Sequence, residues 1–95
     1  MIHLTQQNFY EEINRSKMPI LIEVSSVASL PVELTEKHQG TYKFCRVDVN
    51  AQAALAKRFD LLRIPTSILM HDGEIVQRIC GAYSEEEWEK ILNLN

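Results

Sequence analysis

The run Ile20-Leu21-Ile22-Glu23-Val24 constrains the fold of this chain more than any other segment. A continuous apolar run of this kind is typical of a central strand that is buried on both faces, as in parallel sheets. Parallel strands need crossover connections, which are usually helices, so further strands must alternate with helices along the chain. The run therefore predicts an α/β fold in which helices cover both faces of a sheet.

The segments on either side of this run alternate between strand and helix patterns. Short apolar stretches indicate strands, and apolar residues at helical spacing indicate helices. We expect strands at about residues 1–4, 20–24, 42–49, 67–70 and 74–80. We expect helices at about residues 5–15, 31–38 and 51–59, with a fourth after residue 84. The order is therefore β α β α β α β β α.

Polar residues at the expected helix starts support these boundaries. Thr5 and Asn50 are predicted N-caps, and Ser84 with Glu87 three residues later is predicted to form a capping box. The His-Asp-Gly sequence at residues 71–73 is typical of a tight hairpin turn, so the last two strands must be antiparallel. We therefore expect a central mixed five-stranded sheet flanked by helices on both faces.

Length and composition narrow the function classes. The 95 residues suffice for one domain, which we expect to span residues 1–95. A net charge of −3 without a basic face argues against a nucleic-acid binder, and the longest apolar run is too short to span a membrane. Two cysteines without a CxxC motif and an N-terminus without a signal pattern indicate a cytoplasmic protein.

Five motifs occur along nearly the whole chain in the same order as in thioredoxins. They are IHLTQQNF at residues 2–9, ILIEV at 20–24, RVDVN at 46–50, RIPTSILMHDGEIV at 63–76 and CGAYS at 80–84. The chain therefore resembles the thioredoxin family. The resemblance implies a thioredoxin-like fold, a cis peptide bond between Ile64 and Pro65, and a peptide-binding groove beside that bond.

The segment where the family carries its CGPC motif departs from the family pattern. Counted from Glu23, which stands where the family has a buried acid, the motif falls at Ser29-Leu30-Pro31-Val32. Dithiol exchange needs a thiolate and a second, resolving thiol, and neither Ser29 nor Val32 supplies one. We expect Ser29 to cap the following helix and Pro31 to lie in its first turn. A hydrolytic serine is the lesser alternative.

The acid within the apolar run needs a partner, because an unpaired carboxylate is costly to bury. Arg46 lies on the strand that is expected beside Glu23. We therefore expect a buried structural pair of Glu23 and Arg46. The resemblance implies proton transfer as the alternative role of Glu23.

The two cysteines differ in their expected positions. The thioredoxin-like layout places Cys80 directly before Gly81 and close to the Ile64-Pro65 loop, at the rim of the groove. Cys45 is expected within a strand, where it packs as a small apolar residue. The two strands are not neighbours in the expected sheet, so we expect no disulfide between them.

These observations favour a redox-inactive protein-binding or chaperone-like module over an enzyme. The resemblance implies that a protein or an extended peptide binds in the groove, with no cofactor. The three histidines show no metal-ligand spacing, so no metal site is expected. The alternatives are a single-cysteine oxidoreductase acting through Cys80, and a subunit of a larger assembly; the oligomeric state stays open. The groove is expected to comprise Leu30, Pro31, Ile64, Pro65, Thr66, Cys80, Gly81 and Ala82.

Overall fold

The order of strands and helices is the one that the sequence predicts. A computed structural model describes residues 1–61 and 63–94. The elements are β1 (Ile2–His3), α1 (Phe9–Asn14), β2 (Ile20–Ser25), α2 (Val32–Lys37), β3 (Lys43–Asp48), α3 (Ala53–Lys57), β4 (Thr66–His71), β5 (Glu74–Cys80) and α4 (Glu85–Ile91).

The strands form one mixed five-stranded sheet in the order β1-β3-β2-β4-β5. Strand β3 pairs in parallel with β1 and β2, whereas β4 is antiparallel to β2 and β5. Strand β2 occupies the centre, and all six of its residues are buried. The apolar run at residues 20–24 therefore lies in the central strand, and the predicted α/β sheet is confirmed.

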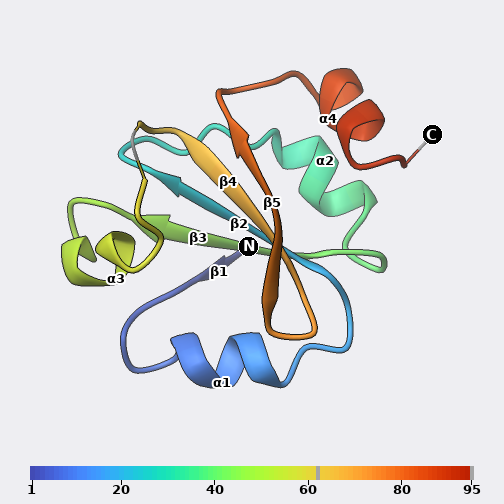
Figure 1. Cartoon of the computed structure of the whole chain (residues 1–95). Helices are drawn as coiled ribbons and strands as arrows, with labels where there is room; N and C mark the ends of the chain where they lie inside the picture. The colour runs from blue at the N-terminus through green and yellow to red at the C-terminus, as the bar shows by residue number, and fades with distance from the viewer. Residues whose placement is uncertain (62, 95) are drawn as a thin grey trace.

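Helices cover both faces of this sheet (Figure 1). On one face Ile22 of β2 belongs to a core that includes Ile13 of α1 and Leu55 of α3. On the other face Leu21 of β2 belongs to a core that includes α2 and α4 residues, among them Trp88. Neighbouring residues of a strand point to opposite faces, so a strand buried on both sides must be apolar at successive positions.

Helices α1 and α3 begin a few residues later than the sequence predicts. Helix α1 begins at Phe9, but Thr5 closes the turn before it: the Asn8 N–H donates to Thr5 Oγ1 at 3.2 Å, and the Thr5 N–H donates to Asn8 Oδ1 at 2.7 Å. Asn50 is not an N-cap, contrary to prediction. Its N–H donates to Oδ1 of Asp48 at 2.9 Å, and α3 starts later. Local side-chain hydrogen bonds tighten the chain before these helices begin.

The hairpin and the last helix form as the sequence predicts. Asp72 and Gly73 both have positive φ angles, 54° and 79°, which a two-residue type I′ turn requires. Ser84 accepts a hydrogen bond from the Glu87 N–H, and the Glu87 side chain accepts one from the Ser84 N–H, so the predicted capping box is confirmed. These two signals fix where β5 begins and where α4 begins.

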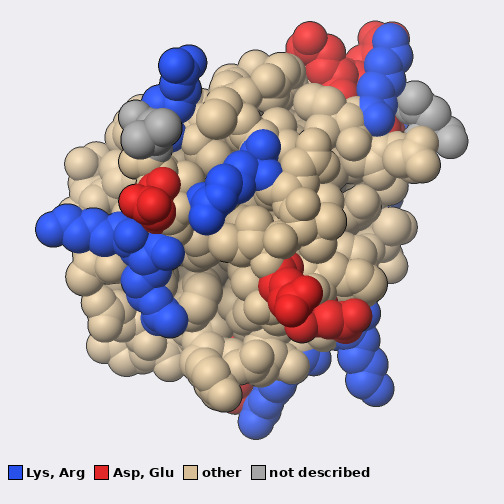
Figure 2. All heavy atoms as spheres, in the orientation of Figure 1, with Lys and Arg blue, Asp and Glu red and all other residues tan. Residues whose placement is uncertain are grey.

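Charged side chains are unevenly distributed over the surface. Figure 2 shows basic side chains gathered over α3 and the middle of β5, and acidic side chains gathered over α4.

Within residues 1–61 and 63–94, no helix is long and apolar enough to cross a membrane.

Candidate functional site

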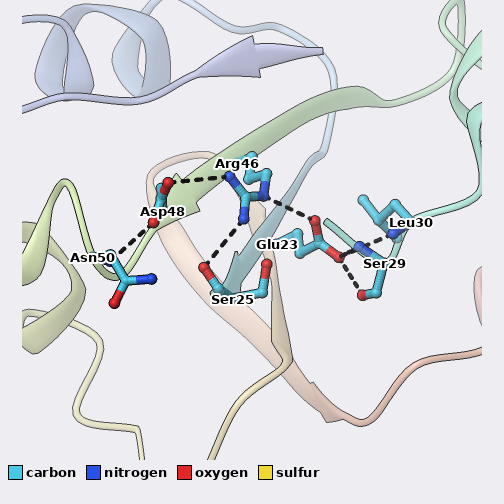
Figure 3. Close-up of polar contacts among 7 residues, drawn as sticks. All are labelled: Glu23, Ser25, Ser29, Leu30, Arg46, Asp48 and Asn50. Atoms are coloured by element: carbon cyan, nitrogen blue, oxygen red, sulfur yellow. Dashed lines mark hydrogen bonds and ion pairs between the residues drawn. The ribbon is translucent and has the colours of Figure 1, made fainter. Parts of the chain in front are cut away.

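The loop between β2 and α2 is anchored to a buried carboxylate. Glu23 is fully buried on β2, and its Oε2 accepts hydrogen bonds from the Ser29 N–H at 2.7 Å and the Leu30 N–H at 2.9 Å. The Ser29 hydroxyl donates to the same oxygen (Figure 3). Hydrogen bonds to an ionised acceptor are among the strongest in proteins, so this carboxylate fixes the end of the loop.

Arg46 faces the other oxygen of this carboxylate. The parallel pairing of β2 and β3 places Glu23 and Arg46 in register, and Arg46 Nε lies 3.4 Å from Glu23 Oε1. The contact is an ion pair rather than a well-aligned hydrogen bond. Arg46 Nη2 also donates to the Ser25 carbonyl at 3.3 Å, and Nη1 lies 3.8 Å from Asp48 Oδ2 (Figure 3). The buried charges thus compensate each other across two strands.

Ser29 does not cap α2, so that prediction is wrong. The N-cap position of α2 is Pro31, with φ −60° and ψ 135°, and it makes no side-chain capping bond. Pro31 therefore lies just before the helix and not in its first turn. The Ser29 hydroxyl instead donates to the Glu23 carboxylate, because a carboxylate is a stronger hydrogen-bond acceptor than a neutral group. The sequence signal for this contact is the acid that stands alone in the apolar run.

The two thiols lie far apart in the sheet. Cys45 on β3 is buried and Cys80 on β5 is exposed, and both are free cysteines. Strands β2 and β4 lie between β3 and β5 in the sheet. Burial raises the pKa of the Cys45 thiol to about 12. A thiol with so high a pKa is almost entirely protonated near neutral pH, and only the thiolate is nucleophilic.

We therefore expect one thiol per folded chain to react with iodoacetamide at pH 8. Peptide mapping locates the label on Cys80, because Cys45 is both buried and protonated at that pH. Unfolding in guanidinium chloride exposes the second thiol, which serves as the control. Labelling of Cys45 at a comparable rate in the folded chain would contradict this expectation.

Several predicted groove residues meet beside the anchored loop. Ile64, Pro65 and Ala82 line a hollow of about 240 Å³ together with residues 25–29 of the loop. The Ile64–Pro65 peptide bond is cis, and the Gly81 N–H donates to the Pro65 carbonyl at 2.9 Å. Gly81 has a φ of 104°, a conformation that favours glycine. Three segments that are distant in sequence thus converge at one end of the sheet.

Other predicted groove residues lie elsewhere. Leu30 is 7% exposed and packs in the core beneath α2 and α4, so its expected place on the groove surface is wrong. Its apolar side chain is buried in this core, while its backbone N–H bonds to buried Glu23. Thr66 is buried, and its hydroxyl donates to the Arg63 carbonyl at 2.7 Å. Together with Cys80 it lines a separate hollow of about 510 Å³.

The comparisons with known proteins agree on one family. The family profile described as thioredoxin matches residues 1–93. Thioredoxin C-2 of Corynebacterium nephridii is 22% identical over 103 residues, which cover all of this chain and 95% of that protein. Thioredoxin C-3 of the same organism is 31% identical over 97% of this chain and 68% of its own length. A thioredoxin H-type of Brassica campestris is 38% identical over 70% of this chain and 53% of its own length.

Proposed function

The chain belongs to the thioredoxin family, and we propose that it acts there as a redox-inactive protein-binding or chaperone-like module. The groove beside Pro65 is the proposed binding site, and a protein or an extended peptide is the proposed ligand. The two free cysteines are consistent with a place in the cytoplasm, where thiols stay reduced.

The observation that carries this proposal is that residue 29 is a serine whose hydroxyl donates to the Glu23 carboxylate. Counted from Glu23, Ser29 and Val32 occupy the positions of the two thiols of the family motif. A hydroxyl cannot exchange with a disulfide, and the Ser29 hydroxyl is held by the Glu23 carboxylate. Val32 is 63% exposed and has no atom that can resolve a mixed disulfide. The segment therefore supports positioning of the loop rather than dithiol chemistry.

The surface beside this segment supports a binding role. Val27 is 76% exposed and Ile64 is 44% exposed, and both line the hollow of about 240 Å³ beside Pro65. Both side chains extend from loops that the sheet and Glu23 hold in place. Apolar side chains on rigidly held loops are typical of recognition surfaces.

The test compares the amount of partner protein from the native host that is captured by the unchanged chain and by a variant with one charged substitution. Ile64→Asp places a carboxylate in the hollow, and we expect at least about a tenfold loss of every partner that binds there, because an unpaired charge is costly to desolvate. Partners are captured by crosslinking and quantified by mass spectrometry, and circular dichroism verifies the fold.

Val76→Asp is the matched control, because Val76 is 61% exposed on β5 and lies outside that hollow. It should leave capture unchanged. Capture that survives Ile64→Asp, or that both variants abolish equally, would contradict the proposed site.

A second candidate function rests on Cys80. Its thiol is exposed and lines the hollow of about 510 Å³, so a disulfide-bearing substrate can reach it. The Cys80 thiolate would attack a substrate disulfide, form one mixed disulfide and release one substrate thiolate. Thiol–disulfide exchange that disappears in Cys80→Ser would support this candidate over the binding module.

A further inference from the structure

Four basic residues lie on α3, in the segment that follows it and on β5, and two of them, Arg63 and Arg78, line the hollow of about 510 Å³. Lys57 ends α3, Arg58 and Arg63 follow it, and Arg78 lies on β5. Figure 2 shows the gathering of basic side chains on this side of the molecule. Although the chain as a whole carries a net charge of −3, the expectation from the sequence that it has no basic face is wrong for this part of the surface.

The charges of this basic surface are not neutralised by ion pairs. Elsewhere Lys37 pairs with Glu85 and Glu89, and Lys43 pairs with Glu12. Among residues 1–61 and 63–94, by contrast, no ion pair joins the four basic residues of this surface to an acid. Asp60 lines the hollow of about 510 Å³ and a neighbouring hollow of about 280 Å³ and contributes one negative charge, so the positive charge that remains available to a ligand is a net one.

Two of the four residues are held in place without losing their charge. Arg78 donates from Nη1 to the Phe59 carbonyl, and the Arg58 guanidinium lies 5.0 Å from the centre of the Phe9 ring. A neutral carbonyl or an aromatic face orients a guanidinium but leaves its net charge in place. The basic surface is thus partly preorganised.

The basic surface is connected to the groove through shared lining residues. Arg63 and Arg78 line the hollow of about 510 Å³, which shares Asp60 and Leu61 with a hollow of about 280 Å³. That second hollow includes Lys57 and reaches Ile64, which also lines the groove hollow beside Pro65. An extended ligand in the groove can therefore continue past Ile64 onto the basic surface.

We propose that the partner of the groove presents an extended acidic segment, in which apolar residues alternate with Asp or Glu. The inference rests on the proposed binding function and adds the chemistry of its partner. Acidic side chains would face Lys57, Arg63 and Arg78, and an apolar side chain would enter the hollow beside Leu61 and Cys80. Opposite charges at such an interface select the partner and speed its association.

Two other occupants fit the surface less well. A nucleic acid is held by many phosphate contacts, whereas two cations, Arg63 and Arg78, line the hollow with apolar walls at Leu61 and Cys80. The acidic helix α4 of a second copy has most of its charges engaged, because Glu85 and Glu89 pair with Lys37 and Glu87 belongs to the capping box, which leaves Glu86. A protein segment with free carboxylates suits the surface best.

The experiment measures binding of three fluorescein-labelled peptides, (Glu-Leu)4, (Gln-Leu)4 and (Lys-Leu)4, by fluorescence anisotropy. We expect (Glu-Leu)4 to bind about tenfold more tightly than (Gln-Leu)4 at low salt, since two or three exposed ion pairs would form. The preference should shrink in 0.5 M NaCl, and (Lys-Leu)4 should bind most weakly. The double variant Lys57→Glu with Arg63→Glu should abolish or reverse the preference.

The control variant is Arg15→Glu with Lys17→Glu. It changes the net charge by the same amount at exposed positions near the end of α1, so it should keep the preference for (Glu-Leu)4. Loss of the preference in both double variants would reduce the effect to overall charge and overturn the inference. Both substituted surfaces are exposed, and circular dichroism verifies each fold.

The remaining outcomes separate this inference from the proposed function. If (Glu-Leu)4 and (Gln-Leu)4 bind equally and Ile64→Asp weakens both, the groove stands and the acidic partner is wrong. If no peptide binds, the proposal of an acidic partner is also wrong, and the capture experiment with Ile64→Asp still tests whether the groove is a binding site. Displacement of (Glu-Leu)4 by the RNA octamer U8 at equal concentration, or sedimentation of a dimer that Arg63→Glu dissociates, would assign the surface to another occupant.

Discussion

We expect the replacement of Glu23 by alanine to lower the free energy of unfolding by about 3–5 kcal/mol, the range found when one partner of a buried ion pair is removed. The substitution leaves the buried guanidinium of Arg46 without its counter-charge. It also removes the acceptor of the Ser29 and Leu30 N–H groups. A urea titration followed by the fluorescence of Trp88, the sole tryptophan and a buried one, measures the loss.

A control variant and a double variant test whether the loss of stability comes from the unpaired buried charge. Glu33→Ala removes an exposed acid from the first turn of α2 and should change the stability by less than about 0.5 kcal/mol. Glu23→Leu combined with Arg46→Leu removes both buried charges and should recover part of the loss, because no lone charge is left. A loss of less than 1 kcal/mol in Glu23→Ala would show that the carboxylate does not anchor the loop.

We expect the protein not to accelerate insulin reduction above the rate of dithiothreitol alone. Ser29 and Val32 stand where the reaction needs two thiols, and the free cysteines lie on β3 and β5, which are not neighbours. Turbidity of precipitating insulin B chain gives the rate, and a dithiol thioredoxin is the positive control. Clear acceleration that Cys80→Ser removes would instead identify Cys80 as a reactive thiol.

Restoring both thiols with Ser29→Cys and Val32→Cys should recover only a small part of a thioredoxin's rate. The new thiol at position 29 would lie against the Glu23 carboxylate, and a nearby negative charge raises the pKa of a thiol. The six-residue helix α2 offsets this only in part through its positive N-terminal end. A rate equal to that of the positive control would contradict this reasoning.

The sheet was predictable because its signals are local. The apolar run at residues 20–24, the turn at Asp72 and Gly73 and the capping box of Ser84 and Glu87 each depend on residues close in sequence. The proximity of Glu23 to Arg46 depends in addition on the parallel register of β2 and β3, for which the resemblance to the thioredoxin family was the guide.

The site was harder to predict because tertiary contacts override local preferences. Ser29 has the chemistry of an N-cap, yet a buried carboxylate from another segment takes its hydroxyl. Leu30 packs with residues of α2 and α4 that are distant in sequence, so its burial depends on the tertiary structure. Asn50 loses its predicted capping role for a local reason, because its own N–H donates to Asp48 Oδ1 and α3 starts later.

The anchoring of the β2–α2 loop also separates its two tasks. Glu23 holds the loop at its last residues, Ser29 and Leu30, whereas Ser26, Val27 and Ala28 at the tip are exposed. The tip can therefore change its sequence while the attachment point keeps its geometry. In evolutionary terms the loop can acquire new binding preferences without refolding the chain, and in protein engineering these three positions are where a displayed library would be inserted.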